Sequence, residues 1–595
     1  MEPKYKFGEE IERKIAKDIL DYEWNLISSK QALRNADYES YLDMFDALRN
    51  EKTYKWQSNI SMPEFATHML VQSANDVDQY FSSLDFVETY VMDSSDEAKL
   101  AAKATKNLIN NTLNRRNLYH YHKFVRAKLI NTINGYVYAR TWWEPDKDQF
   151  NYEILDPRNV IVSPEYTYSI QDKSFVIVWS QTDYEKLLIN KEHFGYFNLN
   201  LVKEKAKTAS GIQKDTKDGK NGVIFGRSYL PRPFNKYERF GKFWVKDTKK
   251  GIVPGIDEFG DVDEKARYAE CVVTIAEIDG TDIMIGFHET PYRDVNDIPY
   301  RPIIRGLCYI HPENDMGAGD GKYARELQIG INDTVNTAND RAMLATLPTL
   351  KVKASTLTDN DSIFFAPGHS IPFETDPNEI SEFKISDDIM GSISMYRLFE
   401  AKMQQVTSKY PPDMGGMPSI ASTTATAIGA ASTSSNKRDK YKDLTFENTF
   451  LCDIYWMIQQ MTYSFALPET GVKLIGEGDI YNFNPSYNFW FKPISQALES
   501  EQSKMAKVKV WNQLLTILAG LQHPNLVEMI NYIISEISAL MGKEYENFAD
   551  KLLNEKIPVM TSGANPEQIS TGDGPSNEYG VPQSGGEIFA REGAQ

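Results

Sequence analysis

The chain has 595 residues, of which 41% are hydrophobic and 25% are charged, so it can bury large cores and should divide into several modules. Its formal net charge of −18 argues against a conventional nucleic-acid binder, which usually carries a basic patch and a high isoelectric point. The charge does not exclude a conduit for DNA, because a channel along which DNA slides should not grip phosphates, and solubility alone explains the acidity equally well.

The first part of the chain is predicted to be helical. One helix is expected over residues 9–50, and another begins at Pro63, a favourable residue for the first turn of a helix. A third helical block runs from residue 96 to residue 133, and Gly135 ends it.

A strand-rich block follows these helices. Apolar runs predict strands at residues 135–143, 150–156, 159–163, 174–180 and 237–245. Thr182 and Glu185 predict a capping box at the start of a short helix, and the polar residues 204–221 predict a solvated loop. Residues 271–287 predict a hairpin that turns at Asp279–Gly280.

Residues 299–348 carry the most informative pattern of the chain. A strand and a Gly-rich turn lead into a helix for which Asp320 is the expected N-cap and Pro348 the stop. An apolar stripe is formed by Tyr323, Leu327, Ile331, Val335, Ala338, Ala342 and Ala345. The opposite face carries Asn332, Asp333, Asn336, Asn339 and Asp340. A polar but mostly uncharged helical face suits contact with further copies of the chain around an axis.

After Pro348, short strands are predicted at residues 350–354, 362–366 and 370–374. A second helix is expected to start at Ser386, with the apolar stripe Ile389, Ile393, Tyr396, Phe399, Met403 and Val406. The next stretch cannot be regular helix, because Pro411, Pro412 and Pro418 remove backbone donors and paired glycines lie between them.

The last third begins with a long amphipathic run that Pro468 closes. One helix over residues 422–466 would extend roughly 65 Å, which is typical of a helix that spans a structure or lines a passage. Strands are predicted at residues 471–475 and 481–491, and helices at 494–520, 525–541 and 545–553. The polar residues 561–595 predict a disordered tail.

No known catalytic pattern is complete. The cluster Gly317, Gly319, Gly321 and Lys322 suggests a phosphate-binding loop, but a Walker motif requires Gly where Met316 stands and Ser or Thr where Tyr323 stands. No calcium loop, zinc ligand set or nucleophile elbow occurs. We therefore expect no enzyme activity and no cofactor, and a flexible turn explains the glycines.

The cysteines and the ends of the chain bear on its compartment. Cys271, Cys308 and Cys452 are far apart and form no CxxC pair, so no disulfide framework follows and a reducing cytosol is the natural compartment. The N-terminus lacks the apolar core of a signal peptide, and no apolar run approaches the roughly 18 residues that cross a bilayer. We expect a soluble chain with no membrane partner.

One segment is basic within this acidic chain. Residues 409–442 hold five cations, Lys409, Lys437, Arg438, Lys440 and Lys442, against Asp413 and Asp439, a local charge of +3. These side chains could contact phosphates without identifying bases. The alternative, favoured when the segment is considered alone, is tight helix packing among small residues with the charges on a solvated face.

Five motifs follow one another along the chain: the W-x-S-N-I-x-M-P motif at Trp56, the block ending in LDPRNVIVSPEY, the YERFGKFWV strand, TPYRDVNDIPYRPII before the helix that contains Gln328 and Asn332, and the TTATAI element at Thr423. In this order they resemble the portal proteins of short-tailed bacteriophages, the head–tail connectors through which DNA is packaged. The resemblance implies an α+β portal fold that assembles as a homododecameric ring around a central channel.

The resemblance also implies a division of the chain. It assigns a wing to residues 1–319, stem helices to 320–347 and 386–409, a clip to 348–385, a tunnel loop to 410–422, a long helix and a return to the wing to 423–493, a helical crown to 494–560 and a disordered tail to 561–595. The tail is too polar and too short for the long C-terminal barrel of some relatives.

The implied contacts follow from this division. The expected channel residues are Lys409, Tyr410, Met414, Gly415, Gly416, Met417, Lys437, Arg438 and Lys440, and the expected clip contacts are Lys351, Lys353, Asp359 and Asp361. The implied partners are double-stranded DNA bound non-specifically, the terminase large subunit, head–tail adaptor and tail proteins, and the capsid and scaffolding proteins. The implied location is the portal vertex of the virion, after assembly in the host cytoplasm. Competing classes are a virion scaffold or adaptor that never touches DNA, and a nucleotide-using motor.

Overall fold

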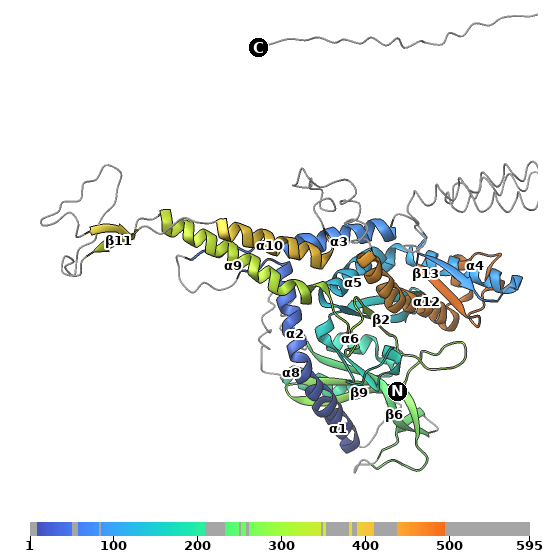
Figure 1. Cartoon of the computed structure of the whole chain (residues 1–595). Coiled ribbons are helices and arrows are strands. Elements are labelled where there is room, and N and C mark those ends of the chain that lie inside the picture. Colours follow the sequence, from blue (N-terminus) through green and yellow to red (C-terminus); the bar gives the residue numbers. More distant parts are fainter. Residues whose placement is uncertain are drawn as a thin grey trace, which may run out of the picture. The chain divides into compact units, whose positions relative to one another are not determined.

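The computed structural model describes residues 9–49, 57–81, 85–93, 95–208, 233–248, 251–256, 261–346, 349–352, 380–383, 390–409 and 437–493. These residues form a mixed α and β structure, which confirms the predicted α+β class (Figure 1). They all belong to one compact unit that ends at Leu498. The predicted tunnel loop, crown and tail and most of the clip lie outside the described residues.

The N-terminal helices follow the predicted order. Helix α1 (Glu9–Lys17), the π-helix η1 (Asp18–Trp24) and α2 (Asn25–Phe45) form one continuous helical run. Helix α3 (Glu64–Phe81) begins directly after Pro63, as the sequence predicts.

The single helix predicted over residues 96–133 is wrong at one point. The structure has α4 (Asp96–Leu113), a 3₁₀ turn η2 (Arg116–Leu118) and α5 (His120–Asn134). Tyr119 lies between the last two in the left-handed region with φ of 52°. A residue with this backbone conformation interrupts a regular helix, and the residue type at position 119 does not predict it.

Gly135 ends α5 with φ of 102°, as predicted. The Gly-rich turn that precedes the central helix packs directly against it, since a Cβ on Gly135 would lie 2.4 Å from the carbonyl carbon of Ala318. A Cβ on Gly319 would lie 2.5 Å from the backbone nitrogen of Gly135. Glycine is therefore required here for the close approach of two backbones, rather than for the flexibility expected from the sequence.

Two antiparallel sheets form the strand-rich block. One has the order β10 (Ile303–Leu307), β2 (Tyr136–Glu144), β3 (Gln149–Leu155). The other has six strands in the order β4 (Val160–Val162), β5 (Phe175–Thr182), β6 (Phe234–Thr248), β8 (Arg267–Ile278), β9 (Thr281–Glu289), with β7 (Gly251–Pro254) on β6. The predicted hairpin is confirmed, because Asp279 and Gly280 both have positive φ between β8 and β9, as a type I′ turn requires.

Three local predictions are corrected. Helix α6 (Tyr184–Ile189) is preceded by Asp183 as N-cap, so Thr182 does not form a capping box. Residues predicted as a strand at 471–475 belong to α13 (Pro468–Ile475), where Pro468 occupies the first turn. The strand predicted at residues 481–491 begins only at Phe489, because a 3₁₀ turn and a loop precede it, and it is β13 (Phe489–Pro493). It pairs with β1 (Val87–Val91), a distant segment for which no strand was predicted. Helices α7 (Lys191–Phe194) and α8 (Leu199–Thr208) complete this region, and α8 extends into the predicted loop.

The main core surrounds the C-terminal helical run. Residues 437–446 are helical and continue into the π-helix η6 (Glu447–Leu451) and α12 (Cys452–Phe465). Their apolar side chains pack with those of α4, α5, β2 and β3, and the most deeply buried are Phe446, Phe450, Leu451, Ile454, Ile458 and Met461. The short 3₁₀ turns η3 (Pro157–Asn159), η4 (Ile170–Asp172) and η7 (Ile480–Asn482) lie in the connections.

A helical hairpin extends from this body. Helix α9 (Asp320–Thr346) and α10 (Met390–Thr407) lie side by side, and β11 (Thr349–Val352) pairs antiparallel with β12 (Ile380–Phe383) at their far end (Figure 1). The two helices approach closely at Gly330, where a Cβ would lie 3.0 Å from the ring of Phe399. The base of the hairpin packs on α2, α3 and α5 through Tyr38, Tyr41, Phe65, Met69, Ile133, Ala324, Ile331 and Met403.

The polar face of α9 binds residues 58–65 of the same chain, which are an extended segment up to Pro63 and the first residues of α3. Four side chains spaced one helical turn apart accept backbone N–H groups: Asp340 from Ser58 (2.6 Å), Asn336 from Ile60 (2.7 Å), Asn332 from Met62 (2.9 Å) and Gln328 from Phe65 (3.0 Å). Asn336 and Gln328 also donate to the carbonyls of Ile60 and Met62. We call these contacts the amide ladder. The expectation that this face of α9 is free for neighbouring copies is therefore wrong at Asn332, Asn336 and Asp340, and also at Asn339, whose amide donates to the Ser58 hydroxyl.

Replacing Asn332 with Ala should loosen the amide ladder locally. The Met62 N–H would lose its acceptor in a part-buried position, at a cost of about 1–2 kcal/mol, or about tenfold in the local opening equilibrium. Hydrogen exchange of a peptide covering residues 57–65 should accelerate accordingly. Asp333→Ala, one position along on the exposed side of α9, is the matched control and should leave this peptide unchanged.

Candidate functional site

The ends of the segment 410–436 meet at the base of the α9–α10 hairpin. Lys409 follows α10, and Asp439 lies in the helical residues 437–446. Their side chains form an ion pair with 2.6 Å between Nζ and Oδ2, and only 2% of the Lys409 side chain is exposed. The two ends of the intervening segment are therefore held together by a buried charge pair.

A second buried cation completes this junction. Lys442 Nζ lies 3.1 Å from Asp320 Oδ2 and 3.0 Å from Asp439 Oδ1, and the Asp320 side chain is fully buried. Burial works to lower the pKa of Lys442, but the two carboxylates outweigh it and hold that pKa well above its ordinary value. Tyr309 Oη donates to Asp320 Oδ1 over 3.0 Å. The Asp320 carboxylate, which was predicted to cap α9, thus accepts a hydrogen bond from Tyr309 and forms an ion pair with Lys442. We call Lys409, Asp439, Lys442, Asp320 and Tyr309 the junction cluster.

Arg438 covers the outer side of this cluster. Its Nε donates to Tyr309 Oη (3.2 Å), one terminal nitrogen donates to the Gln405 carbonyl (3.2 Å), and the guanidinium lies 5.5 Å from the centre of the Tyr309 ring. Arg438 is therefore half-buried and connects α10 to the Gly-rich turn. Lys437 and Lys440 are exposed on the same helical stretch.

A further pair lies one turn along the helix. Lys128 Nζ of α5 bonds Asp443 Oδ1 over 2.6 Å, with side chains 3% and 7% exposed. Asp76 of α3 is close to this pair and accepts from Gln72 Nε2 over 2.8 Å. Burial raises the pKa of Asp76 to about 6, although Lys128 opposes the shift.

His68 connects α3 to the end of α10. Its Nδ1 lies 2.5 Å from the Thr407 hydroxyl, which itself donates to the Met403 carbonyl. Because that hydroxyl hydrogen is committed, we assign the imidazole hydrogen to Nδ1. Burial, with Lys409 nearby, lowers the pKa of His68 to about 4.

The structure separates the predicted channel residues into three groups. The prediction that Lys409 contacts DNA is corrected, because its ammonium group is buried in an ion pair with Asp439 and is not available to a phosphate. Arg438 is half-buried in internal contacts, while Lys437 and Lys440 are exposed. Tyr410, Met414, Gly415, Gly416 and Met417 lie outside the described residues, as do the clip residues Lys353, Asp359 and Asp361; Lys351 lies on β11, opposite Ser381.

The pairing of carboxylates with the buried lysines of the junction cluster was not predicted from the sequence. Asp439 was counted only against the local positive charge, and Lys128, Asp443 and His68 were not considered. The alternation Lys-Arg-Asp-Lys-Tyr-Lys-Asp over residues 437–443 was the available signal, because its acids lie four residues apart and share one helical face.

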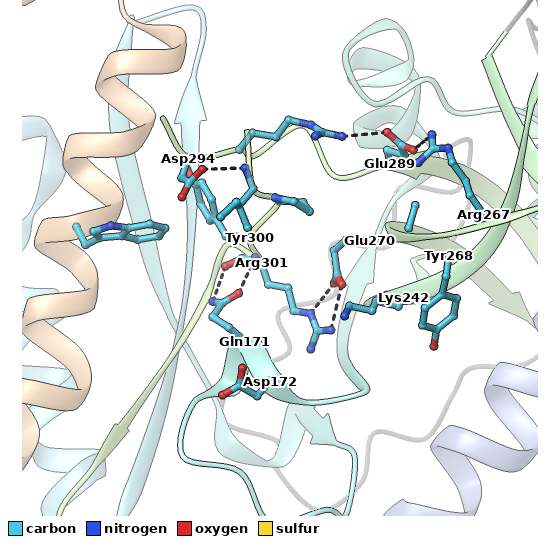
Figure 2. A pocket seen from close by; sticks show the side chains of 15 residues that line it. Gln171, Asp172, Lys242, Arg267, Tyr268, Glu270, Glu289, Asp294, Tyr300 and Arg301 are labelled. Atoms are coloured by element: carbon cyan, nitrogen blue, oxygen red, sulfur yellow. Dashed lines mark hydrogen bonds and ion pairs between the residues drawn. The ribbon is translucent and has the colours of Figure 1, made fainter. Parts of the chain in front are cut away.

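A separate pocket of about 630 Å³ lies between the six-stranded sheet and residues 293–301, as Figure 2 shows. Arg301 and Glu270 form a buried bidentate pair in its wall, with 2.5 Å and 3.2 Å between their atoms. Arg267 and Arg293 both bond Glu289 at the other side. The charges around the pocket therefore largely neutralise one another, and none of the predicted site residues lines it.

Among the described residues, no three His, Cys, Asp or Glu side chains are grouped so that they could hold a metal ion. None of the helices in that part of the chain combines the length and apolarity that crossing a membrane requires. No family model and no curated protein matches this chain.

Asp439→Asn should destabilise the junction strongly. It removes the only carboxylate bonded to Lys409 among the described residues and one of two near Lys442, and breaking a buried pair costs about 3–5 kcal/mol. The midpoint of urea unfolding should fall, and Lys440→Gln, a change at an exposed site nearby, should leave it unchanged. The double change Lys409→Met with Asp439→Leu should recover part of the loss, because Lys442 keeps Asp320. Equal midpoints for Asp439→Asn and wild type would contradict a stabilising junction.

His68 should make stability fall in mild acid. The pKa of His68 is about 4 in the folded protein against an ordinary value of 6.5. Between these two pH values the unfolded chain therefore binds a proton at His68 and the folded protein does not. Stability is lost as pH falls from 6.5 to about 4, by up to roughly 3 kcal/mol. Asp76, with a raised pKa, acts in the opposite direction below pH 6. His68→Gln should therefore flatten or reverse the pH dependence of the melting temperature; an unchanged profile would exclude His68 as its source.

Proposed function

We propose that this chain is the subunit of a bacteriophage portal, the ring-shaped DNA channel at one capsid vertex. In this role the genome is packaged through the ring by the terminase and later ejected, and adaptor and tail proteins attach to it. The proposal assigns no catalytic step to the chain, and it places the protein in the virion after assembly in the host cytoplasm. The ring would be a homododecamer.

The observation that carries the proposal is the α9–α10 hairpin and what it joins. An α+β body, formed by residues before Asp320 and by residues 437–493, supports two long helices that lead to the paired strands β11 and β12. The same order of parts, wing, stem and clip, is what the sequence resemblance implies. The implied tunnel loop, residues 410–422, starts directly after Lys409 of the junction cluster, and Asp439 of the same cluster follows residues 410–436.

The surface of the hairpin supports assembly. Several apolar side chains of α9 and α10 are more than a third exposed, namely Ile329, Met343, Met390, Ile393, Met395 and Leu398. Exposed apolar side chains gathered on one element are typical of a protein interface. Neighbouring subunits in a closed ring would cover them on both sides of each hairpin.

The residues next to the implied tunnel loop support a weak, sequence-independent contact with DNA. Lys437 and Lys440 are exposed where the chain returns from residues 410–436 to the body. They could meet phosphates as DNA passes, without identifying bases. Lys409 and Arg438, in contrast, hold the loop ends in place.

A virion scaffold or adaptor that never touches DNA is the second candidate. The burial of Lys409 favours it, because one of the cations assigned to DNA is neutralised internally. Such a protein could use the same hairpin for assembly, so that DNA retention in particles, rather than ring formation, separates the two candidates.

Electron microscopy of the purified chain tests the proposal. We expect closed rings, and we expect Leu398→Asp with Met395→Asp to shift the population to monomers, because a buried interface rejects two unpaired charges. Leu188→Asp, at a leucine of α6 with the same 50% exposure as Leu398, is the control and should still form rings. Monomers alone at all protein and salt concentrations would exclude the portal function.

A further inference from the structure

The longest acid-free part of the chain ends more than 250 residues before the segment assigned to the channel. Residues 98–143 contain no Asp or Glu, although the chain as a whole has a net charge of −18. This stretch holds nine cations, Lys99, Lys103, Lys106, Arg115, Arg116, Lys123, Arg126, Lys128 and Arg140. It covers most of α4, all of η2 and α5, and most of β2.

Most of these cations are paired in the folded chain. Carboxylates from elsewhere neutralise five of them, in the pairs Lys99–Asp96, Lys103–Asp479, Lys106–Glu88, Lys128–Asp443 and Arg140–Glu238. Lys123 bonds the Asn151 amide and lies over the Tyr152 ring. Arg126, Arg115 and Arg116, in contrast, form no ion pair with any described carboxylate, and the last two are adjacent in the chain.

These two arginines line an open groove of about 350 Å³, with Asn117, Lys147 and Gln149. Arg115 is half-buried, and this burial lowers the pKa of its guanidinium, while the charge of Asp148 opposes the shift. Among the described carboxylates none forms an ion pair with Arg115, so the guanidinium has lost part of its water without gaining a bonded anionic partner. An anion in the groove would supply that partner. Three donors of the wall, two guanidinium groups and the Asn117 amide, come from consecutive residues.

Acidic side chains near the groove are engaged in other contacts. Asp148 accepts from Trp143 Nε1 and from the Leu467 backbone nitrogen, 3.2 Å and 3.1 Å away. Glu144 accepts from Lys147 and Gln149. Asp146 is exposed in the turn between β2 and β3. Lys147 is thus partly neutralised by Glu144, and the charge of Asp148 also acts on Arg115, although no hydrogen bond joins the two. Arg116 is exposed and forms no ion pair with a described carboxylate.

The backbone holds this turn in one unusual conformation. Tyr119, directly after η2, has φ of 52°, and its ring is 62% exposed. A bulky residue in the left-handed region costs about 1–3 kcal/mol and persists only where its surroundings impose it. Residues 115–117 are therefore fixed between the end of α4 and the start of α5, which reduces the entropy that binding would cost.

We propose that the groove formed by Arg115, Arg116 and Asn117 binds the phosphodiester backbone of DNA. Each guanidinium presents a planar set of donors that matches two phosphate oxygens, and the Asn117 amide can donate to a third. No base edge is contacted, so binding is independent of sequence and weakens steeply with salt. The site shares no residue with the implied channel, and it can be tested whether or not the chain forms rings.

Fluorescence anisotropy of a labelled DNA duplex, titrated with the full-length chain over a series of KCl concentrations, tests this site. Arg115→Gln with Arg116→Gln should weaken binding roughly tenfold at low salt and lower the slope of log affinity against log salt by about 2. Lys99→Gln with Lys103→Gln removes the same charge from α4 at two lysines that already have carboxylate partners, and it should retain wild-type affinity. Arg115→Lys with Arg116→Lys should keep most of the salt slope. A second duplex of unrelated sequence should bind equally.

Two outcomes would overturn the proposal. Equal losses in the two Gln variants would mean that DNA responds only to the net charge of the chain. Unchanged DNA binding together with a changed oligomeric state, measured by light scattering on the same samples, would mean that the arginines meet an acidic protein surface such as a second copy. Circular dichroism of every variant verifies that these exposed changes leave the fold intact.

Discussion

The amide ladder is the constraint on which the arrangement of the helical hairpin depends. Four residues of an α-helix rise about 6 Å, and two residues of an extended chain advance about 6.6 Å, so side chains four apart on α9 can meet alternate amides of an antiparallel segment. Asn and Gln suit this role, because their amides both accept and donate. The extended segment thus obtains from a helix the hydrogen-bond partners that a β-strand obtains from its neighbour. The bonded amides are two residues apart up to Met62, and the next is Phe65, three residues on; Pro63, which has no N–H, lies between them.

The ladder and the junction cluster fix α9 at different points along its length. The ladder joins it to the residues that lead into α3, and Asp320 at its first turn joins it to residues 437–446 through Lys442. Helix α3 in turn contacts the end of α10 through His68 and Thr407. Segments from the beginning, the middle and the last third of the chain therefore meet at the base of the hairpin. Loss of any one of these contacts should therefore loosen the attachment of the hairpin to the body, because buried hydrogen-bonded groups have few alternative partners.

Local signals were sufficient for much of the fold. Pro63, Gly135 and the Asp279–Gly280 turn each determine the backbone within a few residues, so the element boundaries there agree with the structure. Tertiary pairing was not predictable in the same way. The Asn-rich face of α9 was correctly recognised as unusual, but its partner lies about 270 residues earlier, and no periodicity in either segment identifies the other. The break at Tyr119 was missed because an aromatic residue gives no warning of positive φ.

The distribution of charge shows why a local net charge is a poor guide to a binding surface. Residues 409–442 have a local charge of +3, and the resemblance implied that Lys409, Lys437, Arg438 and Lys440 line a DNA channel. Lys409, and also Lys442 of the same segment, are instead neutralised by Asp439 and Asp320 and lie out of contact with solvent. Burying those pairs is costly unless their geometry is good, so they contribute to the position of the loop ends rather than to ligand affinity. The two arginines of the groove differ because they follow the end of a helix and no described acid bonds them. What a polyanion can meet is set by which cations the fold leaves unpaired, and Arg115 and Arg116 are two such cations that are adjacent in the chain and line one groove.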